Sequence, residues 1–181
     1  TSFATDLVVG ISSGTTSVSQ ANIVDGKTTG KVTATLSEGT FAALNSLTGT
    51  GNAYTITVSD STALASDLNA LNTKTDTVID VDTVAEITGS IVDLTKFYTD
   101  ADKVVGGAGV DKDDPTNFKN SADNETIKIT DTSIDTKALE LLQKAAGPGT
   151  SGNVVLLNAN TLTGTSAEIA AALAGFGKVT G

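Results

Sequence analysis

Short runs of β-branched residues, in which apolar and polar positions alternate, recur along the chain at a nearly constant spacing. Alternation with a period of two is typical of a half-buried β-strand, so each run predicts a strand. Neighbouring runs lie 23 to 27 residues apart, except for one interval of 49 residues. That interval predicts a further, degenerate strand around Lys103–Val105. The six clear runs are centred near Val9, Ala34, Thr57, Asp80, Ile129 and Leu156.

After most of the strands the apolar spacing changes to three and four residues, which is the spacing of one helix face. In the first such stretch Leu64, Leu68 and Leu71 share a face. Short helices are therefore expected to follow the strands. They are predicted at Thr62–Leu71, Ser90–Tyr98, Asp135–Ala145 and Thr165–Phe176.

Two of these helices have a well-marked start. Ser90 is followed three residues later by Asp93, and Thr165 is followed by Glu168. A hydroxyl and an acid at this spacing form a capping box, which satisfies backbone N–H groups that have no partner inside the helix. Both helix starts are thus predicted from side-chain chemistry as well as from periodicity.

Parts of the chain repeat one another. The sequence TITVSD at Thr55–Asp60 matches TIKITD at Thr126–Asp131, 71 residues later. The sequence ITGS at Ile87–Ser90 matches LTGT at Leu162–Thr165, 75 residues later. Two blocks of the chain therefore look duplicated, with a small length difference in the connecting loop.

The order of strand, helix and strand implies parallel strands with the helix as crossover. A single strand–helix unit cannot bury both of its faces, so neighbouring units must stack. The sequence predicts an α/β solenoid of stacked strand–helix repeats, about 24 residues each. It would have a parallel sheet on one side and short helices on the other. A doubly wound globular domain is the alternative, and the recurring short helix favours the solenoid.

The whole chain, 1–181, is predicted to be one repeat domain with an irregular insertion near 99–124, which is rich in Gly and Asp. A loop of this length is a functional decoration or a degraded repeat, and the degraded repeat is favoured. Gly177–Thr180 repeats the sequence of Gly30–Thr33, which leads into a predicted strand. We therefore expect the chain to be a fragment of a longer array.

Composition narrows the possible functions. Apolar residues make up 39% of the 181 positions but aromatic residues only 4%, and the net charge is −10. An acidic surface without clustered cations repels nucleic acid. The chain has no Cys and no His, which removes disulfides and the commonest catalytic base. No apolar run approaches the roughly 20 residues of a membrane span.

Two glycine motifs suggest enzymes but lack the required context. Gly10–Gly14 has the Gly-x-Ser-x-Gly spacing of a nucleophile elbow, yet a catalytic triad needs a base and the chain has no His. Gly147–Gly152 has the spacing of a dinucleotide-binding loop. That loop must follow a strand and open a helix, whereas these glycines follow a predicted helix. Both motifs are interpreted as turns.

The acidic residues offer a candidate metal site. Asp111, Asp113 and Asp114 form the densest cluster and resemble the start of an EF-hand loop. Pro115 stands at the next ligand position, which excludes a true EF-hand. A looser Ca²⁺ site formed by the three carboxylates is the alternative to a solvated run of charge.

Other carboxylates lie at strand ends. Asp80 and Asp82 alternate with Val81 and would share one strand face, where a pair of carboxylates suits acid–base chemistry or Ca²⁺ binding. Asp60 and Asp131 occupy the same position of the repeat. A recurring position favours a structural role, such as accepting backbone N–H groups in a turn.

The repeated segments resemble those of very large, acidic, Thr/Asp-rich secreted or cell-surface proteins of marine cyanobacteria and other Gram-negative bacteria. The residues that carry the resemblance are Ile56–Asp60, Asp67–Leu71, Ile87–Ser90 and Leu162–Glu168. The resemblance implies a secreted or cell-surface location and a structural, adhesive or S-layer-like role. It brings no catalytic residues with it.

The sequence thus predicts a non-enzymatic structural or adhesive segment of an extracellular bacterial repeat protein, stabilised by calcium if the Asp111 cluster binds Ca²⁺. Its partners would be further copies of itself or neighbouring repeats of the parent protein, or a cell-surface glycan. The alternative is a glycan- or protein-binding module that uses the sheet face or the 99–124 loop. A carboxylate-based hydrolase or lyase would need a deep cleft with two opposed carboxylates.

Overall fold

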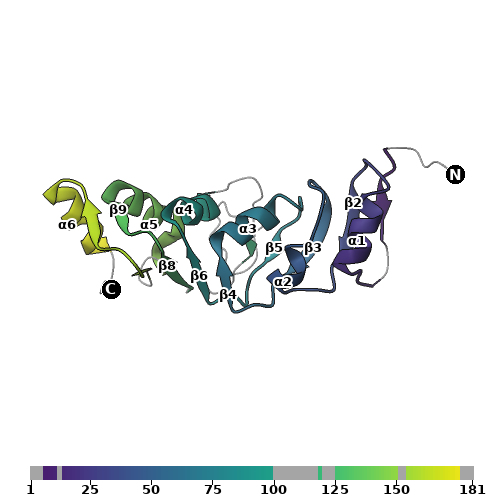
Figure 1. Cartoon of the computed structure of the whole chain (residues 1–181), viewed down its shortest axis with the longest axis horizontal. Coiled ribbons are helices and arrows are strands. Elements are labelled where there is room, and N and C mark those ends of the chain that lie inside the picture. The colour runs from purple at the N-terminus through teal and green to yellow at the C-terminus, as the bar shows by residue number, and fades with distance from the viewer. Residues whose placement is uncertain (1–5, 12–13, 100–117, 120–124, 151–153, 176–181) are drawn as a thin grey trace.

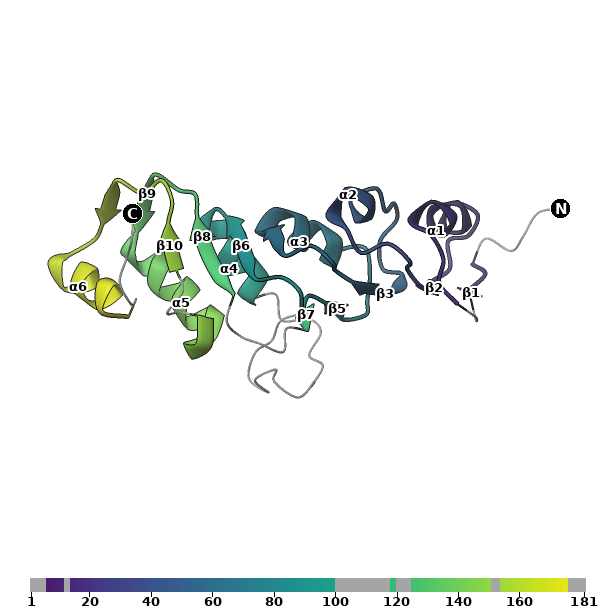
Figure 2. The same cartoon turned by 90° about the horizontal axis from the view of Figure 1, so that it is seen from below.

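The computed structural model describes residues 6–11, 14–99, 118–119, 125–150 and 154–175. Within them the chain alternates strands with helices and is much longer in one direction than in the others (Figure 1). The helices follow one another along the long axis in the order of the sequence (Figure 2). The molecule is therefore an α/β protein in which neighbours in sequence are also neighbours in space.

The strands are short and the helices are of moderate length. The strands are β1 (Val9–Gly10), β2 (Val32–Thr35), β3 (Ala53–Thr57), β4 (Thr62–Leu64), β5 (Ile79–Asp80), β6 (Glu86–Gly89), β7 (Phe118–Lys119), β8 (Thr126–Ile129), β9 (Ser133–Asp135), β10 (Val154–Leu156) and β11 (Thr161–Thr163). The helices are α1 (Val18–Asp25), α2 (Phe41–Leu44), α3 (Ala65–Asn72), α4 (Ile91–Thr99), α5 (Thr136–Thr150) and α6 (Ser166–Gly175). For description the chain is divided into units 1 to 6, each ending with the helix of the same number.

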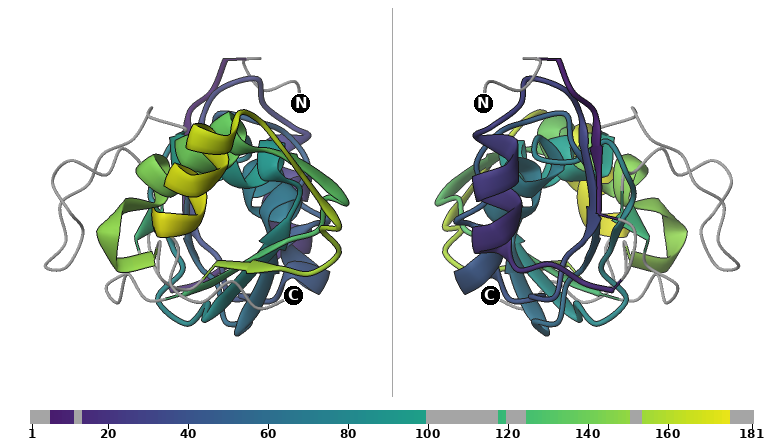
Figure 3. Two further views of the ribbon diagram at one scale, coloured as in Figure 1. Left: turned by 90° about the vertical axis from the view of Figure 1, so that its left-hand side faces the viewer. Right: turned by 90° about the vertical axis from the view of Figure 1, so that its right-hand side faces the viewer.

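All strand pairs are parallel, as the sequence predicts. They form three sheets, with strand orders β1-β2-β3-β5-β7, β10-β8-β6-β4 and β11-β9. The expected single sheet opposite the helices is therefore divided, because most units contribute more than one strand. Seen along the long axis, strands and helices surround the packed interior together (Figure 3).

The core follows the alternation of the strands. In β3 the side chains of Tyr54 and Ile56 point inward and are at most 1% exposed, whereas Thr55 and Thr57 face solvent. Parallel register then places like residues side by side, so that Ile87 pairs with Ile127 in the next unit. The buried residues form one cluster that runs from unit 1 to unit 6. Burying each of these aliphatic side chains stabilises the folded state by about 1.5–3 kcal/mol relative to leaving it exposed.

The helix predicted over Thr62–Leu71 begins later in the structure. Thr62–Leu64 forms β4, and α3 starts at Ala65. Leu64 consequently points outward and is 50% exposed, although the helical spacing predicts it to be buried. The pairing of Leu64 with Thr88 in β6 decides the local structure, because tertiary pairing overrides a weak helical preference.

The remaining expectations concern one strand and two helices. The strand that pairs with β5 is β7 at Phe118–Lys119, while the predicted Lys103–Val105 strand lies outside the described residues. In α6 the residue buried against the core is Ala172, at 2% exposed, and Leu173 is 40% exposed. Helix α5 continues beyond the predicted Ala145 to Thr150.

Candidate functional site

Carboxylates from one unit cap helices of the unit before it. The Val18 N–H of α1 donates to Glu38 Oε2 at 3.1 Å. The Phe41 N–H of α2 donates to Asp60 Oδ2 at 2.7 Å, and the Ile91 N–H of α4 donates to Asp131 Oδ2 at 2.7 Å. In each case the donor is the first residue of its helix, where backbone N–H groups have no helical partner and the helix dipole favours an anion.

We call Glu38, Asp60 and Asp131 the capping carboxylates. The structural role that the repeat predicts for Asp60 and Asp131 is confirmed, but their partner differs from the expected one. They accept an N–H group from the preceding unit, across 19 and 40 residues of chain respectively. The short side chain of an aspartate reaches that N–H only because the units stack in register.

Buried hydroxyl and amide side chains make similar bridges where the strands begin. Asn52 Oδ1 accepts the Val32 N–H of β2 at 2.9 Å, and Thr75 Oγ1 accepts the Tyr54 N–H of β3 at 2.9 Å. Asn52 is 2% exposed and Thr75 is 1% exposed. Because an unsatisfied buried polar group costs about 1–3 kcal/mol, we call Asn52 and Thr75 the buried bridges and count them as structural.

Asparagines on two helices also form hydrogen bonds to backbone groups of a later unit. Asn22 of α1 donates to the Ser46 carbonyl at 2.8 Å and accepts the Thr48 N–H at 2.9 Å. Asn69, at the matching position of α3, donates to the Asp93 carbonyl at 2.9 Å. Asn69 therefore bonds to backbone of the following unit, whereas Asn22 bonds to the segment just after α2, at the start of unit 3. Polar residues hold consecutive units together along both the helices and the strands.

One predicted capping box is complete, at Thr165 and Glu168, and at Ser90 and Asp93 the hydroxyl half is present. Asp93 N–H donates to Ser90 Oγ at 3.1 Å. Glu168 N–H donates to Thr165 Oγ1 at 3.3 Å, and Thr165 N–H donates back to Glu168 Oε2 at 2.7 Å. The Thr165 N–H and hydroxyl and the nearby Lys137 lower the pKa of Glu168, although desolvation opposes them. Helix α6 is thus capped from within its own unit.

The pKa values of Glu38 and Tyr54 are shifted in directions that suit a structural role. The Ser37 hydroxyl, at 2.7 Å, lowers the pKa of Glu38, and the Val18 N–H acts in the same direction against desolvation. The carboxylate form that caps α1 is therefore favoured. Burial, with a further effect of the negative Asp25, raises the pKa of Tyr54 to about 12, which keeps this core hydroxyl neutral.

The other sequence candidates do not come together as a catalytic or metal site. Asp111, Asp113 and Asp114 lie outside the described residues. Asp82 lies in a turn after β5, and its N–H donates to Asp80 Oδ1 at 3.1 Å, so the two do not share a strand face. Among the residues that the structure describes, no group of three or more His, Cys, Asp or Glu could hold a metal ion.

The structure describes only part of each glycine motif. Gly10 belongs to β1, and the central serines of Gly10–Gly14 lie outside the described residues. Gly147 and Gly149 lie within the last turns of α5, so the turn predicted at the start of that motif is wrong. No described helix is long and apolar enough to cross a membrane.

A groove of about 320 Å³ beside α2 contains the carboxylates of Asp60, Asp67 and Glu86. Asp60 accepts the Phe41 N–H, and Glu86 pairs with Lys128 Nζ at 2.6 Å. Two of the three acids are therefore engaged in holding the structure.

Sequence reasoning missed Glu38, Asn52 and Thr75. The signal that could have identified them is the number of residues in the sequence between each polar residue and its backbone partner. Glu38, Asn52 and Thr75 lie 20, 20 and 21 residues beyond Val18, Val32 and Tyr54 respectively. That separation is close to one repeat, so a polar residue one repeat beyond a helix or strand start indicates a bridge.

Replacing a capping carboxylate should weaken the fold. We expect Asp60→Ala to lower the free energy of unfolding by about 1 kcal/mol, the usual value of a lost N-cap acceptor. Asp60→Asn should lose less, because the amide oxygen still accepts the Phe41 N–H. Urea denaturation measures both changes. The exposed Glu140 of α5 supplies the control Glu140→Ala, and equal effects of the two alanine variants would contradict the capping role.

No protein-family model, no curated protein and no solved structure matches this chain. The roles of the described residues are therefore inferred from their own contacts. In those contacts the capping carboxylates and the buried bridges serve backbone groups of the preceding unit.

Proposed function

We propose that this protein is a solenoid and acts as a non-enzymatic structural or adhesive segment of an extracellular bacterial repeat protein. The observation that carries the proposal is the use of the polar side chains. Glu38, Asp60 and Asp131 bond to backbone of the preceding unit, and Asn52 and Thr75 do the same inside the core. Side chains committed in this way build a scaffold and perform no chemistry.

The solenoid interpretation is supported by contacts between successive units. Helices α3 and α4, α4 and α5, and α5 and α6 contact one another in pairs. Strands of units 3 to 6 pair in the order β4, β6, β8 and β10. A structure in which each repeat touches mainly its neighbours is extended, and its stability is approximately a sum of unit and interface contributions.

The extracellular setting is supported by the acidic composition and by the resemblance to large Thr/Asp-rich surface proteins. A net charge of −10 keeps such a chain soluble and attracts cations. Calcium bound by Asp111, Asp113 and Asp114 would offset part of this charge. In this proposal Ca²⁺ stiffens the array and takes no part in a reaction.

A second candidate function is glycan or protein binding by the sheet face. Thr35 of β2 and Thr55 of β3 are exposed and pair directly in the parallel register. Thr33 and Thr57 lie on the same outward face. A flat row of hydroxyl groups can donate and accept hydrogen bonds. Tyr54, however, is buried beneath this face, so stacking on a sugar ring is not available there.

A screen of immobilised glycans separates the two functions. The structural proposal predicts no saturable binding by the intact chain. The double variant Thr35→Val and Thr55→Val removes two hydroxyl groups while preserving the β-branched shape. If the parent chain binds a glycan and the double variant does not, the sheet face is a binding site and a purely structural role is wrong.

The proposed Ca²⁺ binding is tested by monitoring thermal unfolding with circular dichroism, once in EDTA and once in Ca²⁺. We expect a higher Tm in Ca²⁺, because an ion that binds only the folded state stabilises it by mass action. Converting Asp111, Asp113 and Asp114 to Asn together should abolish the shift, and Glu140→Gln should retain it. Equal melting temperatures of the parent chain in both conditions would contradict the calcium part of the proposal.

A further inference from the structure

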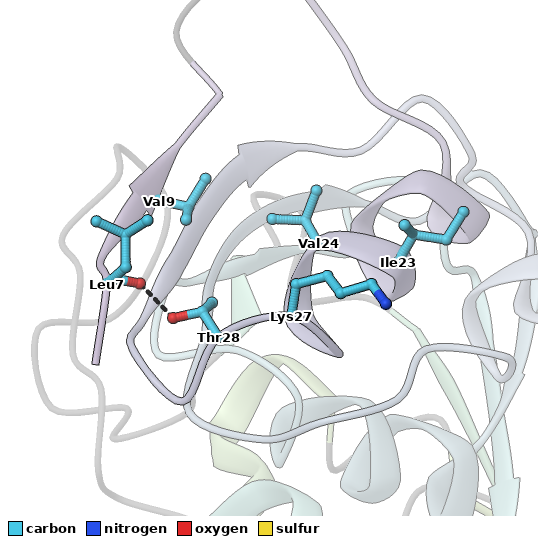
Figure 4. A pocket seen from close by; sticks show the side chains of 6 residues that line it. All are labelled: Leu7, Val9, Ile23, Val24, Lys27 and Thr28. Atoms are coloured by element: carbon cyan, nitrogen blue, oxygen red, sulfur yellow. Dashed lines mark hydrogen bonds between the residues drawn. The ribbon is translucent and has the colours of Figure 1, made fainter. Parts of the chain in front are cut away.

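A groove lies within the series of units, between units 2 and 3. It is the groove of about 320 Å³ beside α2, which we call the edge groove. Its wall holds Thr62 and Leu64 of β4, Thr88 of β6 and Phe41 of α2. A hollow between β1 and α1 lies instead at one end of the series (Figure 4). Because described units flank the edge groove on both sides, a further repeat added at either end of the chain would not fill it.

The edge groove exists because unit 2 lacks a strand that unit 3 has. Unit 2 passes from β2 to α2 through residues 36–40, which contain no strand that pairs with β4. Unit 3 passes from β3 to α3 through residues 58–64, which include β4. The sheet β10-β8-β6-β4 consequently ends at β4, although unit 2 precedes it in the stack. A strand with one unpaired edge is a template for a further strand.

The pairing with β6 shows which backbone groups lie at this edge. The Ser61 carbonyl accepts the Ala85 N–H at 2.9 Å, so Ser61 faces the β6 side. Backbone groups alternate in direction along a strand, which turns Ala63 toward β6 and turns Thr62 and Leu64 away from it. Among the described residues, the Thr62 N–H and carbonyl and the Leu64 N–H have no partner. They can therefore bond to an added strand.

Side chains beside β4 decide what kind of strand fits. Leu64 is 50% exposed and offers an apolar contact. Asp67, in the first turn of α3, is half-buried, and among the described residues its carboxylate has no hydrogen bond or ion pair. Asp60 caps α2 and Glu86 pairs with Lys128. This local excess of negative charge attracts a cationic side chain and repels an acidic one.

We propose that the edge groove binds an extended peptide segment of a partner protein that carries a lysine or arginine. The segment adds to β4 as a further strand and bonds to the free backbone groups of Thr62 and Leu64. Its cationic side chain pairs with Asp67, and an apolar side chain covers Leu64. Because β4 is only three residues long, the backbone bonds are few and the affinity depends strongly on the ion pair with Asp67.

The test measures peptide binding to the full chain by fluorescence anisotropy. The probe is a labelled heptapeptide that begins with lysine and in which lysine and valine alternate. One control peptide carries glutamate at every lysine position. A second control replaces the central valine with proline, which keeps the charge but removes a backbone N–H. We expect saturable binding of the lysine peptide, weaker binding of the proline peptide and no binding of the glutamate peptide.

Variants of the chain locate the binding site. Asp67→Asn removes the unpaired carboxylate and should weaken binding of the lysine peptide about fivefold. Leu64→Pro removes the edge N–H and the apolar contact and should abolish binding, while proline is tolerated on an edge strand. The control Glu140→Gln removes one negative charge from an exposed position of α5 and should bind like the parent chain. Circular dichroism establishes that each variant is folded.

Three results would overturn the proposal. The first is a parent chain that binds the lysine peptide without saturation or no better than the glutamate peptide. The second is equal affinity of Asp67→Asn and Glu140→Gln for the lysine peptide, which decides the matter even if Leu64→Pro does not fold. The third is equal affinity for the proline and lysine peptides, because the contact would then be electrostatic without strand addition. None of these results bears on the structural function, which can stand while this inference fails.

Discussion

Each unit of this protein leaves backbone groups and apolar surface that only the next unit can complete. The first N–H groups of α1, α2 and α4 find their acceptors in Glu38, Asp60 and Asp131, all from the following unit. These helices have four to nine residues, and a helix of that length is marginal in water by itself. These helices therefore form because the neighbouring unit supplies both a cap and an apolar surface.

The same dependence explains the extended shape and the nature of the polar residues. A unit that needs its successor cannot close on itself, so the core grows along one axis. Asn52 is buried and accepts the Val32 N–H while its amide group donates to Asp25 Oδ1. Thr75 is buried too, and its hydroxyl accepts the Tyr54 N–H and donates to the Tyr54 carbonyl. Polar side chains used in this way set the register between units, since a shift by one residue would leave buried donors unsatisfied.

The sequence predicts part of this structure, and the limits have physical causes. Long β-branched runs such as the one around Thr57 identify their strands, and the Ser90 and Thr165 hydroxyls identify their helix starts. The short strand β4 is missed because three residues cannot display a period, so Leu64 is taken for a helical position. Glu38 is missed because its partner Val18 lies 20 residues away in sequence. The proposed calcium residues at 111–114 lie outside the described part of the chain.

Small-angle X-ray scattering tests the stacked arrangement most directly, because it measures the radius of gyration of the monomeric chain. A compact globule of 181 residues would have a radius of gyration of about 16 Å. A chain in which each unit is completed only by its neighbours should be clearly larger than this, with a distance distribution that has a long tail. A value near that of the globule would contradict the stacked arrangement on which the account depends.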